Sequence, residues 1–134
     1  MSDQQFIAIG DIHGCLKSME TLLDKLKPYH DRTFVFVGDY IDRGPASKQV
    51  VDYLLDFKEK VDCVFLRGNH EQMLLDAFQR NNINMWMMNG GRTTLDSYGM
   101  TKDDNSLPTE HEEFYTNTRL YYDTENYFFV HAGI

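Results

Sequence analysis

Four short apolar runs divide the chain, and each is followed within three residues by glycine and by polar residues of types that can bind metal ions. The runs lie at residues 6–9, 33–37, 61–66 and 127–130. Aromatic and β-branched residues dominate them, which is typical of buried strands. The last run and Tyr121-Tyr122 flank a polar turn, a spacing that predicts two paired strands. We therefore expect strands whose carboxyl ends carry the polar groups.

Between these runs, apolar residues recur every three or four positions, which is the period of an amphipathic helix. This period predicts helices over residues 15–27, from Pro45 to about residue 60, from Glu71 onward, and over residues 110–117. Asn89-Gly90-Gly91 interrupts the pattern and reads as a helix breaker. The alternation of strands and helices predicts an α/β domain with a mainly parallel sheet and crossover helices.

The polar groups form four motifs, which begin at Gly10, Gly38, Gly68 and His131. They contain the residues Asp11, His13, Asp39, Asp42, Arg43, Asn69, His70 and His131. Asp11 precedes Asp39 by 28 residues, and Asp39 precedes Asn69 by 30, about the length of a strand-helix-strand crossover. Neighbouring strands would then carry their motifs to the same sheet edge, where open α/β sheets bind ligands. Carboxylate, imidazole and carboxamide groups together suit first-row metal ions, so we interpret the motifs as a two-metal hydrolytic centre.

The first three motifs resemble the signature of the calcineurin-like metallophosphoesterases. Asp42-Arg43-Gly44 and Asn69-His70-Glu71 are similar to the forms in the phosphoprotein phosphatase branch, the serine/threonine protein phosphatases, and residues 89–95 resemble a segment of its bacterial members. The resemblance implies an α/β/β/α sandwich, of which residues 1–134 would be a single domain lacking its C-terminal part. A last metal-binding histidine of the family, in a Gly-His-Thr type motif, has no counterpart, so we expect a truncated chain.

The resemblance also implies which residues bind metal. Asp11, His13 and Asp39 match the ligands of a first ion, and Asn69 and His131 match ligands of a second ion that Asp39 bridges to the first. Two such cations lower the pKa of a shared water and supply hydroxide. Manganese is the expected ion, with iron and zinc as alternatives, because this ligand set accommodates all three.

Three further residues would act on the substrate. His70 resembles a general acid that protonates the departing alkoxide, and Asp42 would orient its ring. The guanidinium of Arg43 could grip two phosphate oxygens. The implied activity is hydrolysis of phosphoserine or phosphothreonine, or of phosphotyrosine or small phosphate esters. A symmetrical dinucleoside tetraphosphate hydrolase is one alternative, against which Asp42 argues, and a catalytically incomplete metal-binding fragment is another.

Composition narrows the possible partners and compartments. The 134 residues carry a net charge of -8 and a pI near 4.9, without the basic clusters that nucleic-acid binding requires. The N-terminus has no secretory signal, and no apolar stretch is long enough to span a membrane. We expect a soluble cytoplasmic protein with a phosphoprotein or small phosphate ester as its partner. Cys15 and Cys63 lack Cys-x-x-Cys spacing, which favours free thiols.

Each candidate also has a plainer structural interpretation. Asp11 and Asp39 could cap a helix or a turn, His131 could be a hydrogen-bonded structural histidine, and Arg43 could form an ion pair with Asp42. For several other residues the structural role is the favoured prediction. These are Glu71 as a helix-start charge, Cys15 as a buried small side chain, His30 and His111 as solvated side chains, and residues 85–88 as core or as a lip of the cleft.

Overall fold

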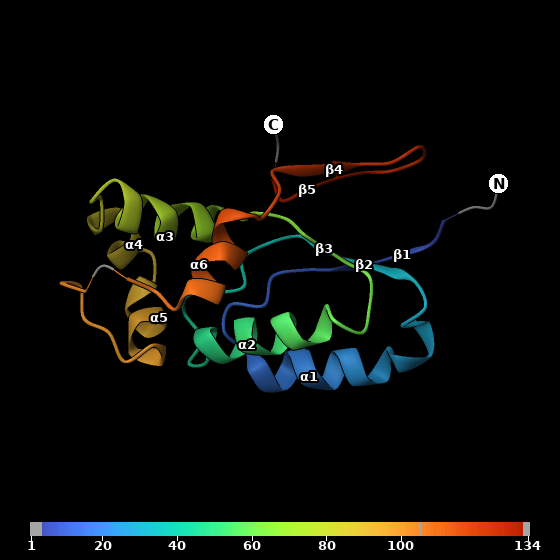
Figure 1. The fold of residues 1–134 in the computed structure, drawn as a ribbon, viewed down its shortest axis with the longest axis horizontal. Coiled ribbons are helices and arrows are strands. Elements are labelled where there is room, and N and C mark those ends of the chain that lie inside the picture. Colours follow the sequence, from blue (N-terminus) through green and yellow to red (C-terminus); the bar gives the residue numbers. More distant parts are fainter. Residues whose placement is uncertain (1–3, 105, 133–134) are drawn as a thin grey trace.

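A three-stranded parallel sheet forms the middle layer of the structure, a computed structural model that describes residues 4–104 and 106–132 (Figure 1). Its strands are β1 (Phe6–Ile9), β2 (Thr33–Phe36) and β3 (Cys63–Phe65), in the order β1-β2-β3. Phe6 pairs with Thr33 and Phe34 with Cys63. All four residues of β2 are buried, as expected for the central strand. The first three predicted strands are confirmed, although two are shorter than predicted.

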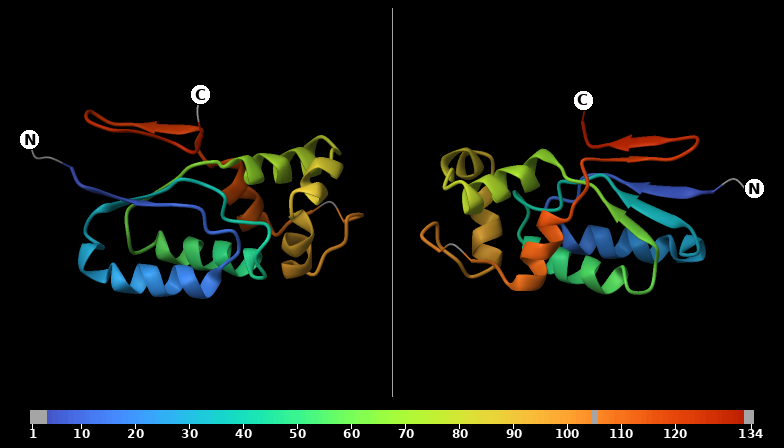
Figure 2. Two further views of the ribbon diagram at one scale, coloured as in Figure 1. Left: turned by 180° about the vertical axis from the view of Figure 1, so that it is seen from behind. Right: turned by 45° about the horizontal axis from the view of Figure 1, so that its top comes forward.

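Two crossover helices and a short 3-10 turn cover one face of this sheet (Figures 1 and 2). They are α1 (Leu16–Lys25), η1 (Lys27–Tyr29) and α2 (Ser47–Phe57). Their buried side chains recur at helical spacing, as the sequence predicts. However, α2 begins two residues after Pro45. The reason is that the Ala46 N–H donates to the Gly14 carbonyl at 3.0 Å, which keeps this segment in a loop packed on the first motif.

Four helices gather beyond the carboxyl ends of the strands (Figure 1). They are α3 (Asn69–Gln79), α4 (Asn84–Met88), α5 (Gly91–Ser97) and α6 (Thr109–Thr116). The sequence does not predict α5, because its Gly90-Gly91 start reads as a breaker. Gly90 instead adopts a φ of 98° as the N-cap of this helix, a conformation that glycine tolerates without steric cost.

The last two strands pair with each other and not with the parallel sheet. β4 (Tyr121–Asp123) and β5 (Phe128–Val130) form an antiparallel hairpin that lies over the sheet face opposite α1 and α2 (Figures 1 and 2). Aromatic rings of this hairpin, including Phe129 at 5.3 Å, pack edge-on against Phe6 of β1. The prediction of two strands around a turn is confirmed. The two strands pair antiparallel because a short turn joins them.

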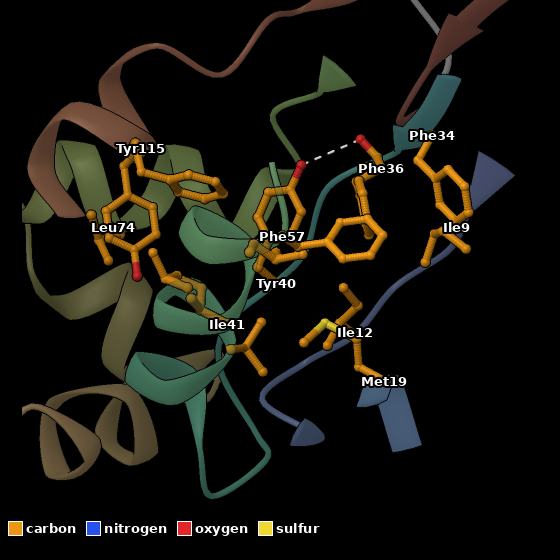
Figure 3. Close-up of a cluster of buried hydrophobic side chains, with 14 of the residues drawn as sticks. Ile9, Ile12, Met19, Phe34, Phe36, Tyr40, Ile41, Phe57, Leu74 and Tyr115 are labelled. Carbon is orange, nitrogen blue, oxygen red and sulfur yellow. Dashed lines mark hydrogen bonds between the residues drawn. The ribbon is translucent and has the colours of Figure 1, made fainter. Parts of the chain in front are cut away.

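The core beneath the sheet is unusually aromatic and reaches the loop of the second motif. Phe34 and Phe36 of β2 pack against Phe57 of α2, and Tyr40 continues the cluster (Figure 3). The Tyr40 hydroxyl donates to the carbonyls of Leu66 and Phe36, at 2.7 and 3.3 Å. This buried phenol fixes the chain next to Asp39, so core packing and site geometry are joined at one residue.

The solvent exposure of three side chains differs from the sequence-based expectation. Cys15 is exposed, because it stands at the N-cap of α1 outside the core. His111 is buried, with its Nε2 2.7 Å from Asp52 on α2. His30 is partly buried, and its Nε2 lies 3.0 Å from the Leu23 carbonyl. Within the described part of the chain, none of the helices combines the length and apolar character needed to cross a bilayer.

Candidate metal centre

The first motif forms the loop after β1 and presents one histidine nitrogen to two carboxylates. The Nδ1 of His13 lies 2.8 Å from the Ile41 carbonyl, to which it donates. The opposite nitrogen, Nε2, is 3.7 Å from carboxylate oxygens of both Asp11 and Asp39. A ring held by a backbone carbonyl with its other nitrogen free is the usual arrangement of a metal-binding histidine.

The second motif is tied to the first through the backbone of Asp39. The Asp39 carbonyl accepts hydrogen bonds from the N–H groups of Ile12 and His13, each at 2.9 Å. Its carboxylate is buried and lies between the other candidate ligands. Asp39 adopts a φ of 59°, which is costly for a residue with a Cβ and is found where surrounding contacts over-determine the backbone.

Glu71 supplies much of that constraint. Its Oε1 accepts from the N–H groups of Asp39 at 2.7 Å and Gly68 at 2.9 Å, and its Oε2 accepts from that of Tyr40 at 2.8 Å. Burial raises the pKa of Glu71, and these donors act against the rise because they stabilise the ionised carboxylate. The prediction of a helix-start charge is confirmed, since Glu71 lies in the first turn of α3. The sequence did not predict that Glu71 also clamps the second motif to the third.

The third motif and the hairpin complete the centre. The Nδ1 of His131 donates to the Val37 carbonyl at 2.8 Å, and its Nε2 lies 3.1 Å from Asp39 and 3.2 Å from the Oδ1 of Asn69. The Asn69 oxygen thus faces only acceptors. Reversing the amide would turn these contacts into hydrogen bonds. A cation among these atoms favours the orientation with the oxygen inward, so the donor set fits a metal ion.

The candidate ligands form two clusters that overlap at Asp39. One joins Asp39 to His13 and His70, and the other joins it to Asp11 and His131, with all ligand atoms of a cluster within 4.8 Å of one another. A carboxylate shared by two clusters is the arrangement that a bridged pair of ions needs. The structure therefore brings the five predicted metal ligands together, although Gly133 of the fourth motif lies outside the described residues.

A family model of the calcineurin-like phosphoesterases matches residues 5–134. The chain belongs to this family. Its members use a dimetal centre, which agrees with the two clusters that share Asp39. The predicted fold class is confirmed, and β4 and β5 form a second, two-stranded sheet.

Relatives of this metallophosphoesterase include two kinds of phosphatase. The chain is 33% identical over 139 residues (94% of this chain, 55% of the relative) to the asymmetrical bis(5'-nucleosyl)-tetraphosphatase PrpE of Oceanobacillus iheyensis. It is 33% identical over 130 residues (95% and 40%) to the symmetrical bis(5'-nucleosyl)-tetraphosphatase of Pseudomonas syringae pv. tomato. It is 41% identical over 85 residues (62% and 37%) to serine/threonine-protein phosphatase 1 of Salmonella typhimurium.

The solved structure of a metallophosphoesterase from Sphaerobacter thermophilus shares the fold, with a TM-score of 0.61 at 18% identity. The match covers 95% of this chain and 46% of that one. The chain thus spans about half, or less, of the length of the proteins it matches.

This metallophosphoesterase also has a buried histidine-carboxylate pair, whose histidine lies in one of the two clusters of candidate ligands. The Nδ1 of His70 donates to the Oδ2 of Asp42 at 2.7 Å, and the His70 ring stands 4.7 Å from that of His13. Burial raises the pKa of Asp42, and hydrogen bonds from Thr94, His70 and Trp86 oppose the rise. Trp86 and Thr94 come from α4 and α5, and sequence reasoning missed both. The resemblance of residues 89–95 to a family segment was the one signal near them.

Arg43 lies exposed at the end of the second motif. Within residues 4–104 and 106–132, its guanidinium makes no hydrogen bond or ion pair, and the Asp42 carboxylate is held by other groups. The alternative in which Arg43 merely braces Asp42 is therefore wrong. Its backbone N–H donates to the Gly90 carbonyl at 3.2 Å, so the residue is anchored while its side chain stays free to reach an anion.

Two glycines permit the close approach of the second and third motifs. A Cβ at Gly38 would collide with the backbone of Gly68, and a Cβ at Gly68 would collide with the Asp39 carboxylate. Larger residues at either position would push the loops apart and separate the candidate ligands. These glycines thus shape the metal centre although they offer it no ligand atom.

Proposed function

We propose that this chain forms the metal-binding part of a phosphatase that hydrolyses phosphoserine or phosphothreonine. The observation that carries the proposal is the buried His70–Asp42 pair, whose histidine lies in one of the two clusters of candidate ligands that share Asp39. A serine or threonine alkoxide is a poor leaving group that needs a proton. A nucleotide phosphate leaves more readily and has less need of one. The buried histidine-carboxylate pair therefore favours phosphoprotein over dinucleoside tetraphosphate as the substrate.

Each residue then has a defined task. His70 holds a proton on the nitrogen opposite Asp42 and delivers it to the leaving oxygen, while Asp42 keeps the ring in that orientation. The free guanidinium of Arg43 binds two phosphate oxygens. Bound metal ions would stabilise the phosphoryl charge and activate water. We propose manganese, held by Asp11 and Asp39 with the other ligands described above, because oxygen-rich sites with imidazole suit it.

The first experiment measures metal binding and substrate choice together. The purified chain is titrated with Mn²⁺ by calorimetry and assayed on a phosphoserine peptide, diadenosine tetraphosphate and p-nitrophenyl phosphate. We expect about two ions per chain for wild type and about one for His131→Ala, because Asp11, His13 and Asp39 remain. His30→Ala, which alters a histidine remote from the site, serves as the control. Hydrolysis of the phosphopeptide and not of the dinucleotide would support the proposal.

Two other outcomes favour the alternatives. A preference for diadenosine tetraphosphate would assign the chain to the tetraphosphatase relatives, and the products, two diphosphates or a mono- and a triphosphate, would identify the symmetrical or asymmetrical reaction. Manganese binding without hydrolysis of any ester would favour the alternative of a metal-binding fragment. The cytoplasmic location and bacterial origin expected from the sequence remain predictions.

A test of the general acid uses the leaving group. His70→Ala should lower the rate on phenyl phosphate at least tenfold more than on p-nitrophenyl phosphate, because the activated phenol needs less protonation. Equal losses on both esters would remove the general-acid role while leaving the phosphatase assignment intact.

A further inference from the structure

The Asp42 carboxylate is enclosed by donors that come from three separate helices. Besides the His70 imidazole of α3, it accepts the indole N–H of Trp86 on α4 and the hydroxyl of Thr94 on α5. Asp42 itself is fully buried. We propose that Trp86 and Thr94 are positioning residues that fix the Asp42 carboxylate and, through it, the His70 ring in the orientation for proton delivery. This inference rests on the proposed function.

The indole of Trp86 sets the plane of the carboxylate. Its Nε1 lies 2.9 Å from Oδ1 and 2.8 Å from Oδ2 of Asp42, so one N–H is shared between both oxygens. The ring is fully buried and cannot easily tilt. A Cβ at Gly91 would come within 2.6 Å of it, and Phe78 packs against it at a centroid distance of 5.9 Å. The start of α5 and the body of α3 therefore wedge the donor in place.

The hydroxyl of Thr94 holds both the side chain and the backbone of Asp42. It donates to Oδ1 at 2.6 Å and accepts the Asp42 N–H at 2.9 Å. Ser47 adds a second acceptor for that N–H, at 3.1 Å. Asp42 has a φ of 76°, so its backbone is strained and depends on such contacts. Thr94 thus fixes the position of the Asp42 backbone and of Oδ1, and Trp86 fixes the rotation of the carboxylate.

These contacts act on His70 because they leave the Asp42 carboxylate only one orientation. With Oδ1 satisfied by Thr94 and both oxygens facing Trp86, the 2.7 Å bond from Oδ2 to the His70 Nδ1 stays aligned. Removing the Trp86 indole N–H or the Thr94 hydroxyl would leave the buried Asp42 carboxylate with one hydrogen bond fewer. The carboxylate would then rotate to form another hydrogen bond. The His70 ring would then lose its fixed orientation. The segment of α4 and α5 therefore contributes to the site from more than 40 residues away.

The first measurement follows the His70 ring proton by NMR and needs no activity. We expect a slowly exchanging Nδ1–H signal from His70, identified among the histidine ring protons by its loss in His70→Ala. Trp86→Phe keeps an aromatic ring without the N–H, and Thr94→Val keeps the shape without the hydroxyl. Each should speed exchange of that proton at least tenfold, whereas Thr94→Ser should restore protection. Thr93→Val, which removes a hydroxyl of the same helix that bonds the Gly90 carbonyl and not Asp42, is the matched control and should leave the exchange rate unchanged. Unchanged protection in Trp86→Phe would overturn the inference.

The second measurement uses the leaving-group ratio. Trp86→Phe should reduce the rate on phenyl phosphate at least fivefold more than on p-nitrophenyl phosphate, and it should add nothing in a His70→Ala background. A further loss in that background would show that Trp86 acts through structure in general and would overturn the positioning role. Absence of hydrolysis by wild type would count against the proposed function alone, because the proton exchange rates still decide the positioning.

Discussion

The carboxylate of Glu71 clamps two ligand-bearing loops, so replacing it with glutamine should lower the free energy of unfolding by about 2 kcal/mol. A glutamine of the same shape keeps Oε1 with its bonds to the Asp39 and Gly68 N–H groups. It places an NH₂ group where Oε2 accepts the Tyr40 N–H at 2.8 Å. The bond to the Tyr40 N–H is lost and two donors then face each other in a buried site, which costs about 1 to 3 kcal/mol.

Urea unfolding is a suitable assay, because the chain has one tryptophan and Trp86 is fully buried. With a slope of about 2 kcal/mol per molar urea, the expected loss moves the midpoint down by about 1 M. The titration is done in chelator, so that differences in metal binding do not add to the result. The slope should stay the same, since the variant exposes the same surface on unfolding.

The matched control is Glu112→Gln. Glu112 also lies in the first turn of a helix, α6, but it is exposed. Its replacement removes only a favourable charge near a helix start, which contributes about 0.5 kcal/mol. Equal midpoints for Glu71→Gln and Glu112→Gln would refute the clamp and return Glu71 to the role of a simple helix-start charge.

Two further predictions concern groups away from the metal centre. Burial raises the pKa of the Cys63 thiol to about 12, whereas Cys15 is exposed, so alkylation at pH 8 should label Cys15 alone in the native chain and both thiols in urea. Burial raises the pKa of Asp52, but hydrogen bonds with Lys48 and His111 outweigh it and leave the pKa below its ordinary value. Because a depressed pKa stabilises the fold only while the carboxylate is ionised, Asp52→Asn should unfold at lower urea than wild type at pH 7. That difference should shrink as the pH falls through the depressed pKa of Asp52, and a difference that grows in acid would contradict the assignment.

Local patterns were enough to predict the strand ends and their ligands. Asp11, Asp39 and Asn69 follow apolar runs within a few residues, and glycines mark the turns between. Parallel pairing then brings such loops to one edge without further information. The crossover helices followed from their apolar period for the same reason, since α1 and α2 each bury one face against the sheet.

The remaining parts depend on contacts between residues far apart in sequence. Trp86 and Thr94 meet Asp42 across 44 and 52 residues, and nothing in their local sequence distinguishes them from core side chains. Glu71 reaches Asp39 across 32 residues, and its position in a helix start gave it a sufficient local explanation. The sequence predicts a solvated His111 because acidic residues flank it in a helix start, whereas its partner Asp52 lies 59 residues earlier. The spacing of apolar residues along the chain carries no information about such contacts between distant residues.

Backbone strain joins the stability of this fold to the geometry of its site. His13, Asp39, Asp42 and Arg43 all have positive φ, at a cost of about 1 to 2 kcal/mol each for residues other than glycine. The hydrogen bonds of Glu71 and Thr94 to the N–H groups of Asp39 and Asp42 hold two of them in place. Loss of such a bond relaxes a loop that carries a candidate ligand or its neighbour. Substitution of Glu71 or Thr94 should therefore lower both the free energy of unfolding and the affinity for metal. Substitution of a candidate ligand should lower the affinity for metal alone.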